Sequence, residues 1–426
     1  MKHFFARIYL VIALLGVNCP ATYSSVLAQN ETEKKTIESI QSLLPGIELK
    51  PGKDGSIASA DFSKCTKDWS AAISALSELP TLTSITASGP NATHDKIASL
   101  KRLPSLKILK IDQSLASDET IEIISQFAVL EELTADRCQL SNASLKSLAN
   151  VKTLKRIRLP RTAISDEGLG YLEKMSQLEL LDLAECQLSD AGILHLQALT
   201  RVRNLSLSGK GISNSGFAKL TSMNGLAALS LQDCNITGEE AAKTLQQFSK
   251  LKELSLVRVP IGDEVFIGIK NAKELTKLRL RGTNVTSSGV ASLLVAYRSL
   301  TSLELSESTV GDEALVGIGK LPKLEDLNLL RTKITPSGIG SLAKLPLKKL
   351  NLDDIAAMDD SAIESIKNFD GLEFLHLGKT KVTDHGVLKL QTMTKLKDLI
   401  LNDTSVSEAA ITELNKKLPG LKVRLK

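Results

Sequence analysis

Apolar residues recur along this chain in the order L-x-x-L-x-L, followed by a turn and then by apolar positions at helical spacing. The unit returns about every 24 residues between Ile57 and Leu421, and its clearest copies begin at Leu154 and Leu372. The alternation of apolar and polar residues predicts a short strand in each copy, and the spacing after it predicts a short helix. Because one unit cannot bury its apolar face alone, we expect the copies to stack into one parallel sheet over one continuous aliphatic core.

A column of mostly polar residues stands twelve positions after the leading apolar residue in nearly every copy, where the helix should begin. It holds Asp118, Asn142, Asp166, Asp190, Asn214, Gly238, Asp263, Ser287, Asp312, Pro336, Asp360, Asp384 and Glu408. Most of these residue types favour a helix N-cap, so we expect each to accept hydrogen bonds from its own helix. This interpretation is preferred to a metal site or an acid–base array. The small residues two positions later, such as Gly168 and Gly216, are expected to let the helix approach the sheet closely.

Four cysteines occupy a second column, eight positions after the leading apolar residue, and no two of them fall in adjacent copies: Cys65, Cys138, Cys186 and Cys234. An even number of cysteines in an exported chain ordinarily suggests disulfide pairs. Strands two copies apart, however, are separated by about 10 Å, whereas a disulfide needs Cα atoms within about 7 Å. We therefore predict four free, buried thiols. The same spacing argues against a zinc site, whose ligands must converge on one point.

The beginning of the chain has the features of a secretory signal peptide over residues 1–28. Lys2 and Arg7 precede an apolar run at 8–17, and Val26-Leu27-Ala28 offers a cleavage site before Gln29. The run is too short to span a bilayer, which takes about twenty residues. A lipoprotein would be modified at Cys19, but Asn18 stands where a small residue is normally required. The sequence thus favours export to the periplasm, cell envelope or medium, without a membrane span after cleavage.

The rest of the chain divides into a cap and the repeats. We expect residues 29–56 to form an N-terminal capping helix and turn, with an amphipathic helix over 32–44. Its apolar side carries Ile37, Ile40, Leu43 and Leu44. Residues 57–426 hold about 15 copies of the repeat and a last partial strand at 421–426. These segments occupy the whole sequence, which leaves no room for a separate catalytic domain.

The repeat, written L-x-x-L-x-L-x-x-(C/T)-x-I-(T/S)-D-x-G-L, resembles the leucine-rich repeat family over about residues 57–426. It is similar to the cysteine-containing subclass of F-box adaptor proteins, and closer still to exported, planctomycete-type bacterial proteins with ribonuclease-inhibitor-like solenoids. The resemblance implies an α/β fold: a right-handed solenoid with a concave parallel β-sheet and short convex helices. It also implies protein–protein recognition on the concave face, by analogy of fold. No F-box precedes the repeats, so a ubiquitin-ligase role is not supported.

Composition and motifs narrow the possible functions. Hydrophobic residues make up 42% of the chain and aromatic residues 3%, which indicates an aliphatic core and excludes a disordered chain. The formal net charge of +5 is near balance, so we expect no nucleic-acid partner. The sequence has no Walker loop, dinucleotide fingerprint, HExxH or CxxC motif. His376, the one histidine predicted on the concave face, is interpreted as a surface residue. We expect no enzyme activity, catalytic residue, cofactor or metal.

The outward positions of the predicted strands define a candidate binding face. One basic patch gathers Arg137, Lys155, Arg156, Arg158 and Arg161, and a second gathers Lys252, Arg258, Lys277, Arg279 and Arg281. Between them lie acidic residues and then a run of small ones: Glu179, Asp182 and Glu185, followed by Ser206, Ser208, Ser230 and Ser255. Arg158 and Arg279 should stand about 24 Å apart along the sheet. Arginine side chains suit carboxylates, phosphates and sulfated sugars, so the face could hold an acidic or extended partner. A solvated sheet of mixed charge is the competing interpretation.

Three functional hypotheses remain open. The first is an exported, non-enzymatic and monomeric binding module whose partner, a protein and possibly an acidic one, docks on the concave face. The second is a structural or assembly protein of the cell envelope that acts through its ends or its convex face. The third is an intracellular, F-box-like adaptor, which requires that residues 1–28 are not a cleaved signal.

Overall fold

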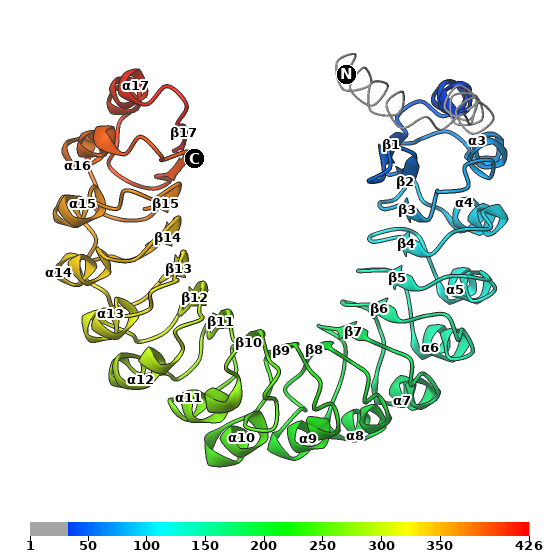
Figure 1. Ribbon diagram of the computed structural model, residues 1–426, viewed down its shortest axis with the longest axis horizontal. Helices are drawn as coiled ribbons and strands as arrows, with labels where there is room; N and C mark the ends of the chain where they lie inside the picture. The colour runs from blue at the N-terminus through cyan, green and yellow to red at the C-terminus, as the bar shows by residue number, and fades with distance from the viewer. Residues whose placement is uncertain (1–32, 426) are drawn as a thin grey trace, which may run out of the picture.

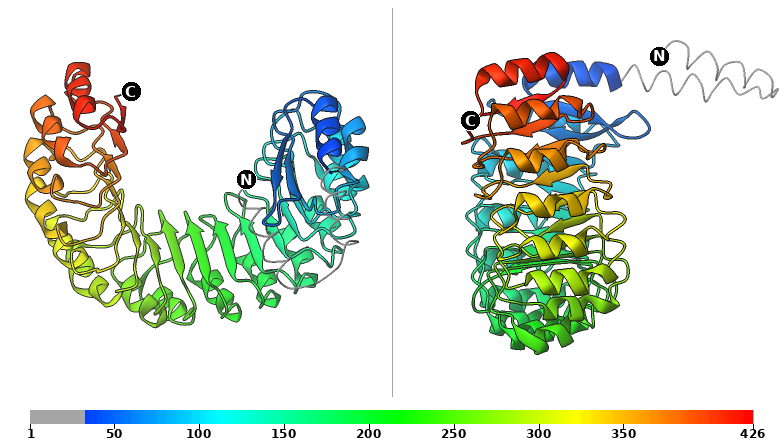
Figure 2. Two further views of the ribbon diagram at one scale, coloured as in Figure 1. Left: turned by 45° about the horizontal axis from the view of Figure 1, so that its top comes forward. Right: turned by 90° about the vertical axis from the view of Figure 1, so that its left-hand side faces the viewer.

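The computed structural model describes residues 33–425, which form one open arch (Figure 1). The strands line the inner, concave side of the arch and the helices lie on its outer, convex side, as two further views also show (Figure 2). The predicted fold class, an open solenoid with a concave parallel sheet and short convex helices, is therefore confirmed. The predicted signal peptide at 1–28, with Cys19, lies outside the described residues.

Among the described residues, seventeen strands form one sheet in which each strand pairs with the next along the chain. All neighbours are parallel except β1 and β2, which are antiparallel. The strands are β1 (Glu48–Pro51), β2 (Ile57–Asp61), β3 (Ser84–Thr86), β4 (Ile108–Lys110), β5 (Glu132–Thr134), β6 (Arg156–Arg158), β7 (Leu180–Leu183), β8 (Asn204–Ser208), β9 (Ala228–Gln232), β10 (Glu253–Val257), β11 (Lys277–Arg279), β12 (Ser302–Glu304), β13 (Asp326–Asn328), β14 (Lys349–Asn351), β15 (Phe374–His376), β16 (Asp398–Ile400) and β17 (Lys422–Arg424).

From β2 onward, a short helical segment returns the chain from each strand to the next, whereas β1 and β2 are joined by a turn. The α-helices are α3 (Ser70–Leu76), α4 (His94–Ser99), α5 (Asp118–Ile124), α6 (Asn142–Leu148), α7 (Asp166–Leu169), α8 (Asp190–Ile193), α9 (Asn214–Lys219), α10 (Gly238–Leu245), α11 (Glu264–Gly268), α12 (Ser287–Leu293), α13 (Asp312–Ile318), α14 (Pro336–Ile339), α15 (Asp360–Ile366), α16 (Asp384–Leu388) and α17 (Glu408–Lys417). Several continue into a 3₁₀ turn: η1 (Leu100–Arg102), η2 (Gly170–Lys174), η3 (Leu194–Ala198), η4 (Leu220–Ser222), η5 (Ile269–Asn271), η6 (Leu294–Ala296), η7 (Gly340–Leu342) and η8 (Lys389–Thr392).

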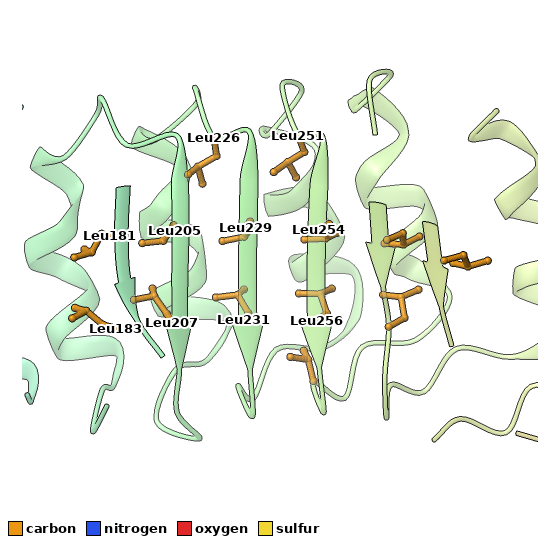
Figure 3. Close-up of a cluster of buried hydrophobic side chains, with 14 of the residues drawn as sticks. Leu181, Leu183, Leu205, Leu207, Leu226, Leu229, Leu231, Leu251, Leu254 and Leu256 are labelled. Carbon is orange, nitrogen blue, oxygen red and sulfur yellow. The ribbon is translucent and has the colours of Figure 1, made fainter. Parts of the chain in front are cut away.

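The core is one aliphatic layer between the sheet and the helices. In register along neighbouring strands, Leu205, Leu229 and Leu254 stack on one another. They and the second inward row, to which Leu207 and Leu231 belong, point away from the concave face (Figure 3). All five side chains are buried. The stacking explains the constant register, because a slip of one residue would turn each leucine towards water.

The N-terminal end differs from the repeats. The helix predicted over 32–44 is present over residues 33–43, where Ile40 is buried, and the following Leu44 is buried as well. Leu43, which we placed on the buried side, is exposed. The strand β1 was not predicted, and by pairing antiparallel with β2 it covers the first edge of the parallel sheet. Covering an edge removes a row of unpaired backbone groups.

The N-cap prediction is wrong, and the reason is a contact between repeats. The caps of the helices are mostly the serine or threonine one position earlier, such as Ser189 before α8 and Ser213 before α9. The Asp190 carboxylate instead accepts two hydrogen bonds from the next repeat, from the Ser213 N–H at 2.7 Å and the Ser213 hydroxyl at 2.5 Å. The same pair of bonds joins Asp118 to Ser141, Asp166 to Ser189, Asp263 to Thr286, Asp312 to Thr335, Asp360 to Thr383 and Asp384 to Ser407.

We call this series of bonds the carboxylate ladder. It also corrects the role given to the small residues two positions later. A Cβ on Gly216 would lie 2.2 Å from Asp190 Oδ1, and a Cβ on Gly192 would lie 2.3 Å from Asp166 Oδ1. These glycines therefore make room for the carboxylate of the preceding repeat and not for the sheet.

The four cysteines are free and buried, as predicted. Their column is a hydrogen-bonded position: the thiol of Cys138 donates to the carbonyl of Ile111 at 3.1 Å, and the hydroxyl of Thr162 donates to that of Leu159 at 2.8 Å. Burial raises the pKa of the Cys65 thiol to about 11 and that of Cys234 to about 12. The thiols are therefore protonated and unreactive near neutral pH.

Candidate functional site

A shallow hollow of about 180 Å³ lies on the concave face at the middle of the arch. Seven of the predicted binding residues line it: Arg158, Asp182, Ser206, Ser230, Ser255, Lys277 and Arg279. The hollow spans β6 to β11, so adjacent strands each supply part of its floor.

The floor is low because small side chains occupy neighbouring strands at the same register. Asp182, Ser206, Ser230 and Ser255 lie side by side, with Arg158 before them and Arg279 after them. Among the described residues, no hydrogen bond is made by the hydroxyls of the three serines, which we call the serine row. Three free donor–acceptor groups at the strand spacing of about 4.8 Å can bind an extended polar chain laid across the strands.

A second row of lining residues was missed by the sequence reasoning. Asn204, Ala228 and Glu253 lie two positions before the serine row and share its face of the sheet. Their signal was the same alternation that identified the serines. Basic charge singled out Arg156 and Lys277 in this same register row, but neither basic charge nor a serine side chain marked these three residues, which lie between them.

The other five predicted residues lie outside the hollow. Arg137 and Arg161 follow their strands at positive φ, 53° and 54°, so they belong to the turn that leaves the sheet. A residue with positive φ recurs at this position after most strands, and in two repeats that residue is a glycine, Gly209 and Gly282. Lys155, Arg156 and Arg281 are held by carboxylates, as described next.

Ion pairs between repeats change the picture of two basic patches. In the first patch, Lys155 lies 3.0 Å from Glu131, Arg156 lies 2.5 Å from Glu132, and Arg161 pairs with both Asp136 and Glu185. Hydrogen bonds from Lys155 and Lys107 hold the pKa of Glu131 below its usual range. These basic side chains are therefore largely neutralised by their neighbours.

The second patch is paired in the same way. Lys252 lies 3.2 Å from Glu274, Lys277 2.6 Å from Glu253, and Arg279 3.7 Å from Glu304. Arg258 binds Asp233 through two hydrogen bonds of 2.7 Å, and Arg281 binds Glu307 through bonds of 2.8 and 3.0 Å. Hydrogen bonds from these arginines lower the pKa of Asp233 and of Glu307.

Two basic residues of the candidate face differ from the rest. Within residues 33–425, neither Arg137 nor Arg158 has a carboxylate within 4.0 Å of its guanidinium. Arg158 lies at one end of the hollow, where Asp182 is its register partner on the next strand. The Asp182 carboxylate is engaged by the N–H of Ala184 at 3.1 Å. Arg158 is thus the guanidinium at the hollow that is most available to a ligand.

The described part of the chain offers little else for chemistry. It contains no group of three or more His, Cys, Asp and Glu side chains placed to hold a metal ion. None of its helices is long and apolar enough to cross a membrane. The carboxylates that look like an acidic array in the sequence are engaged in the carboxylate ladder.

Comparison with known proteins identifies the repeats. Residues 190–342 match the family described as FBD-associated F-box protein At5g56370, LRR repeats. No curated protein matches the chain significantly. Among solved structures, a chain from the yeast Rad7–Elc1 complex is 19% identical, with a TM-score of 0.56, and the match covers 97% of this chain and 96% of that one.

Two bacterial proteins are similar at lower scores. An internalin from Listeria monocytogenes is 16% identical, covering 91% of this chain and 93% of that one, with a TM-score of 0.47. A leucine-rich-repeat protein from Leptospira interrogans is 17% identical, covering 82% and 92%, also with a TM-score of 0.47. The family match shows leucine-rich repeats over residues 190–342, and the yeast chain is similar to this one in fold over nearly its whole length.

Proposed function

We propose that this protein is an exported, non-enzymatic binding module that recognises a protein partner at the central hollow of its concave face. The observation that carries the proposal is the serine row: Ser206, Ser230 and Ser255 have unused hydroxyls between Arg158 and Arg279. Hydroxyls can donate to and accept from an extended main chain, and the guanidinium of Arg158 suits a carboxylate. An extended, acidic segment of a partner fits this arrangement.

The size of the hollow favours a macromolecular partner. Sites for small molecules usually enclose about 300–1,000 Å³ and bury most of the ligand. At about 180 Å³, this hollow accommodates a few side chains of a larger surface. The yeast chain of the same fold was solved in the complex of Rad7 with Elc1, so that fold takes part in a protein assembly there. Export, the bacterial planctomycete-type assignment and a monomeric state belong to the same proposal and rest on the sequence alone.

The convex face supports a second candidate function, assembly within the cell envelope. Ile267, Leu293 and Val316 are 49%, 36% and 53% exposed. They come from α11, α12 and α13, which follow one another along the outside of the arch (Figure 1). Exposed apolar side chains on successive elements are typical of contact surfaces.

A third candidate, an intracellular adaptor, has one observation in its favour: the match of residues 190–342 to repeats of an F-box protein. It requires that residues 1–28 remain on the chain. N-terminal sequencing of the protein purified from its source decides between this function and export, because a mature N-terminus after residue 28 contradicts the adaptor.

Affinity capture from envelope and culture extracts of the source tests the main proposal. The bait is the mature chain, compared with Arg158→Glu/Arg279→Glu and with Ser230→Trp, which fills the hollow. The matched control is Lys146→Glu/Lys243→Glu, which makes the same charge change on the convex helices α6 and α10. We expect both hollow variants to lose a partner that the control retains. If all baits capture the same proteins, the hollow is not the binding site. Loss of the partner only in Ile267→Asp/Val316→Asp would favour the convex face.

A further inference from the structure

One flank of the arch is strongly basic. Because parallel strands are joined by crossover connections, every segment that leads from a helix into the next parallel strand lies on the same flank. The segments that lead into β10, β11, β12, β13 and β14 carry nine exposed lysines and arginines and two carboxylates, Glu274 and Glu325. The positive charge is therefore concentrated here, since the whole chain has a formal net charge of only +5.

The two carboxylates do not neutralise this flank. Glu274 pairs with Lys252 at 3.2 Å, and Glu325 pairs with Lys348 at 2.8 Å. Within residues 33–425, the other basic side chains of these segments take part in no ion pair and donate no hydrogen bond. On the concave face, by contrast, carboxylates of neighbouring repeats hold most of the basic side chains. We call the seven unpaired residues the basic flank: Lys250, Lys270, Lys273, Arg298, Lys320, Lys323 and Lys344.

A hollow of about 160 Å³ lies in the basic flank, where the segments before β11 and β12 meet. Lys270, Lys273 and Arg298 line it, and none of its lining residues is acidic. Tyr297, which also lines the hollow, is buried, and its hydroxyl donates to the Phe266 carbonyl, so this wall is held in place. Ammonium and guanidinium groups around so small a hollow suit a single phosphate group.

The basic flank forms part of a flat side of the molecule. Seen edge-on, the two limbs of the arch overlie each other, so the arch lies close to one plane (Figure 2). None of the exposed large apolar side chains of residues 33–425 lies in the segments of the basic flank. This side therefore offers many positive charges in one plane and no apolar anchor.

We propose that the basic flank lies on a membrane surface rich in anionic phospholipids and binds their phosphate groups without inserting into the bilayer. A flat array of cations contacts a flat array of headgroups at many points at once, and each lysine or arginine near such a surface strengthens binding about fivefold. A linear polyanion would need a groove that joins several repeats, whereas the hollow at Lys270 is lined by residues of two neighbouring segments. The proposal is independent of the central hollow, which opens into the arch and not onto its flat side (Figure 1).

Cosedimentation with lipid vesicles tests the proposal. The protein is the chain from residue 29, which contains every described element and lacks the apolar run at 8–17. It should sediment with vesicles of equal parts phosphatidylcholine and phosphatidylglycerol, and not with phosphatidylcholine alone. Lys270→Glu/Lys273→Glu/Arg298→Glu should weaken this binding about a hundredfold or more. Raising the salt from about 0.1 M to about 1 M should release the wild type, because the Debye length falls from about 10 Å to about 3 Å.

The matched control is Lys210→Glu/Lys333→Glu/Lys381→Glu, which makes the same change of charge at exposed residues of the turns that follow the strands, on the opposite flank. It should bind within about fivefold of the wild type, because that flank lies beyond a Debye length from the membrane. Circular dichroism checks that both variants are folded.

Three results would overturn the proposal. The first is no binding of the wild type to the anionic vesicles at low salt. The second is an equal loss in both triple variants, which would make net charge and not the basic flank responsible. The third is binding of the wild type to soluble heparin but not to the vesicles, which would identify a polymer site. Loss of vesicle binding in Arg158→Glu/Arg279→Glu alone would assign it to the central hollow instead.

Discussion

The contact between Asp190 and Gly216 can be tested by a double-mutant cycle. Gly216 lies in α9, and an added Cβ would meet Asp190 Oδ1 at 2.2 Å, Cγ at 2.9 Å and the backbone Cα at 3.1 Å. Gly216→Ala should therefore force the carboxylate away from Ser213. Overpacking of this kind destabilises by about 1–3 kcal/mol, offset by about 0.5–1 kcal/mol because alanine favours a helix over glycine. We expect a net loss of about 1–2 kcal/mol.

Asp190→Ala removes the two bonds of 2.5 and 2.7 Å to Ser213. The site is half-buried, so we expect a loss of about 2 kcal/mol from these charge-assisted bonds. In the double variant, the methyl group of Ala at position 216 occupies the space that the carboxylate has left. The double variant should then lose about 1–1.5 kcal/mol of stability, which is less than the sum of about 3–4 kcal/mol expected if the two substitutions acted independently.

Urea denaturation followed by far-ultraviolet circular dichroism measures the four proteins of the cycle. The control is Gly170→Ala, because a Cβ there meets only the His195 ring at 3.8 Å. This control should be neutral or stabilised by up to about 1 kcal/mol. A double variant as unstable as the sum of the single variants would refute the idea that the glycine column exists for the carboxylate ladder.

Three further predictions follow from the repeats. Burial raises the pKa of Asp118, but four hydrogen bonds from Ser141 and Ser144 lower it by more, so the pKa lies below its usual value. The stabilisation that Asp118 gives the folded state is therefore fully present above its pKa in the unfolded chain, near 3.8, and is lost as the pH falls through its lower pKa in the folded state. Asp118→Asn should flatten the acid limb of a curve of folding stability against pH. Gln113 has a φ of 57°, in the left-handed region that glycine adopts without strain. Gln113→Gly should therefore raise the free energy of unfolding measured in urea by about 0.5–1 kcal/mol, and Gln113→Val should lower it. The chain that follows residue 28 should resist iodoacetamide while it is folded and take up four adducts when it is unfolded, at Cys65, Cys138, Cys186 and Cys234. Mass spectrometry counts the adducts, and rapid labelling of the folded protein would contradict the burial of these thiols.

The candidate face shows how far sequence patterns reach. Alternation along the strands placed Ser206, Ser230 and Ser255 together on the outward side, and the structure has them in register. Charge alone suggested basic patches, but Arg156 and Arg281 have carboxylate partners from neighbouring repeats. Whether a guanidinium is paired depends on side-chain reach across two strands, which a list of residue types does not contain.

The sequence by itself determined the period, the strand–helix order, the inward leucines and the free thiols, because these follow from alternation and spacing within one repeat. Only the tertiary structure decided that Asp190 accepts hydrogen bonds from Ser213 and that Gly216 makes room for the Asp190 carboxylate. These contacts join residues of different repeats. They depend on the stacking register and on the twist between neighbouring units, and the same residue types can meet or miss one another according to that geometry.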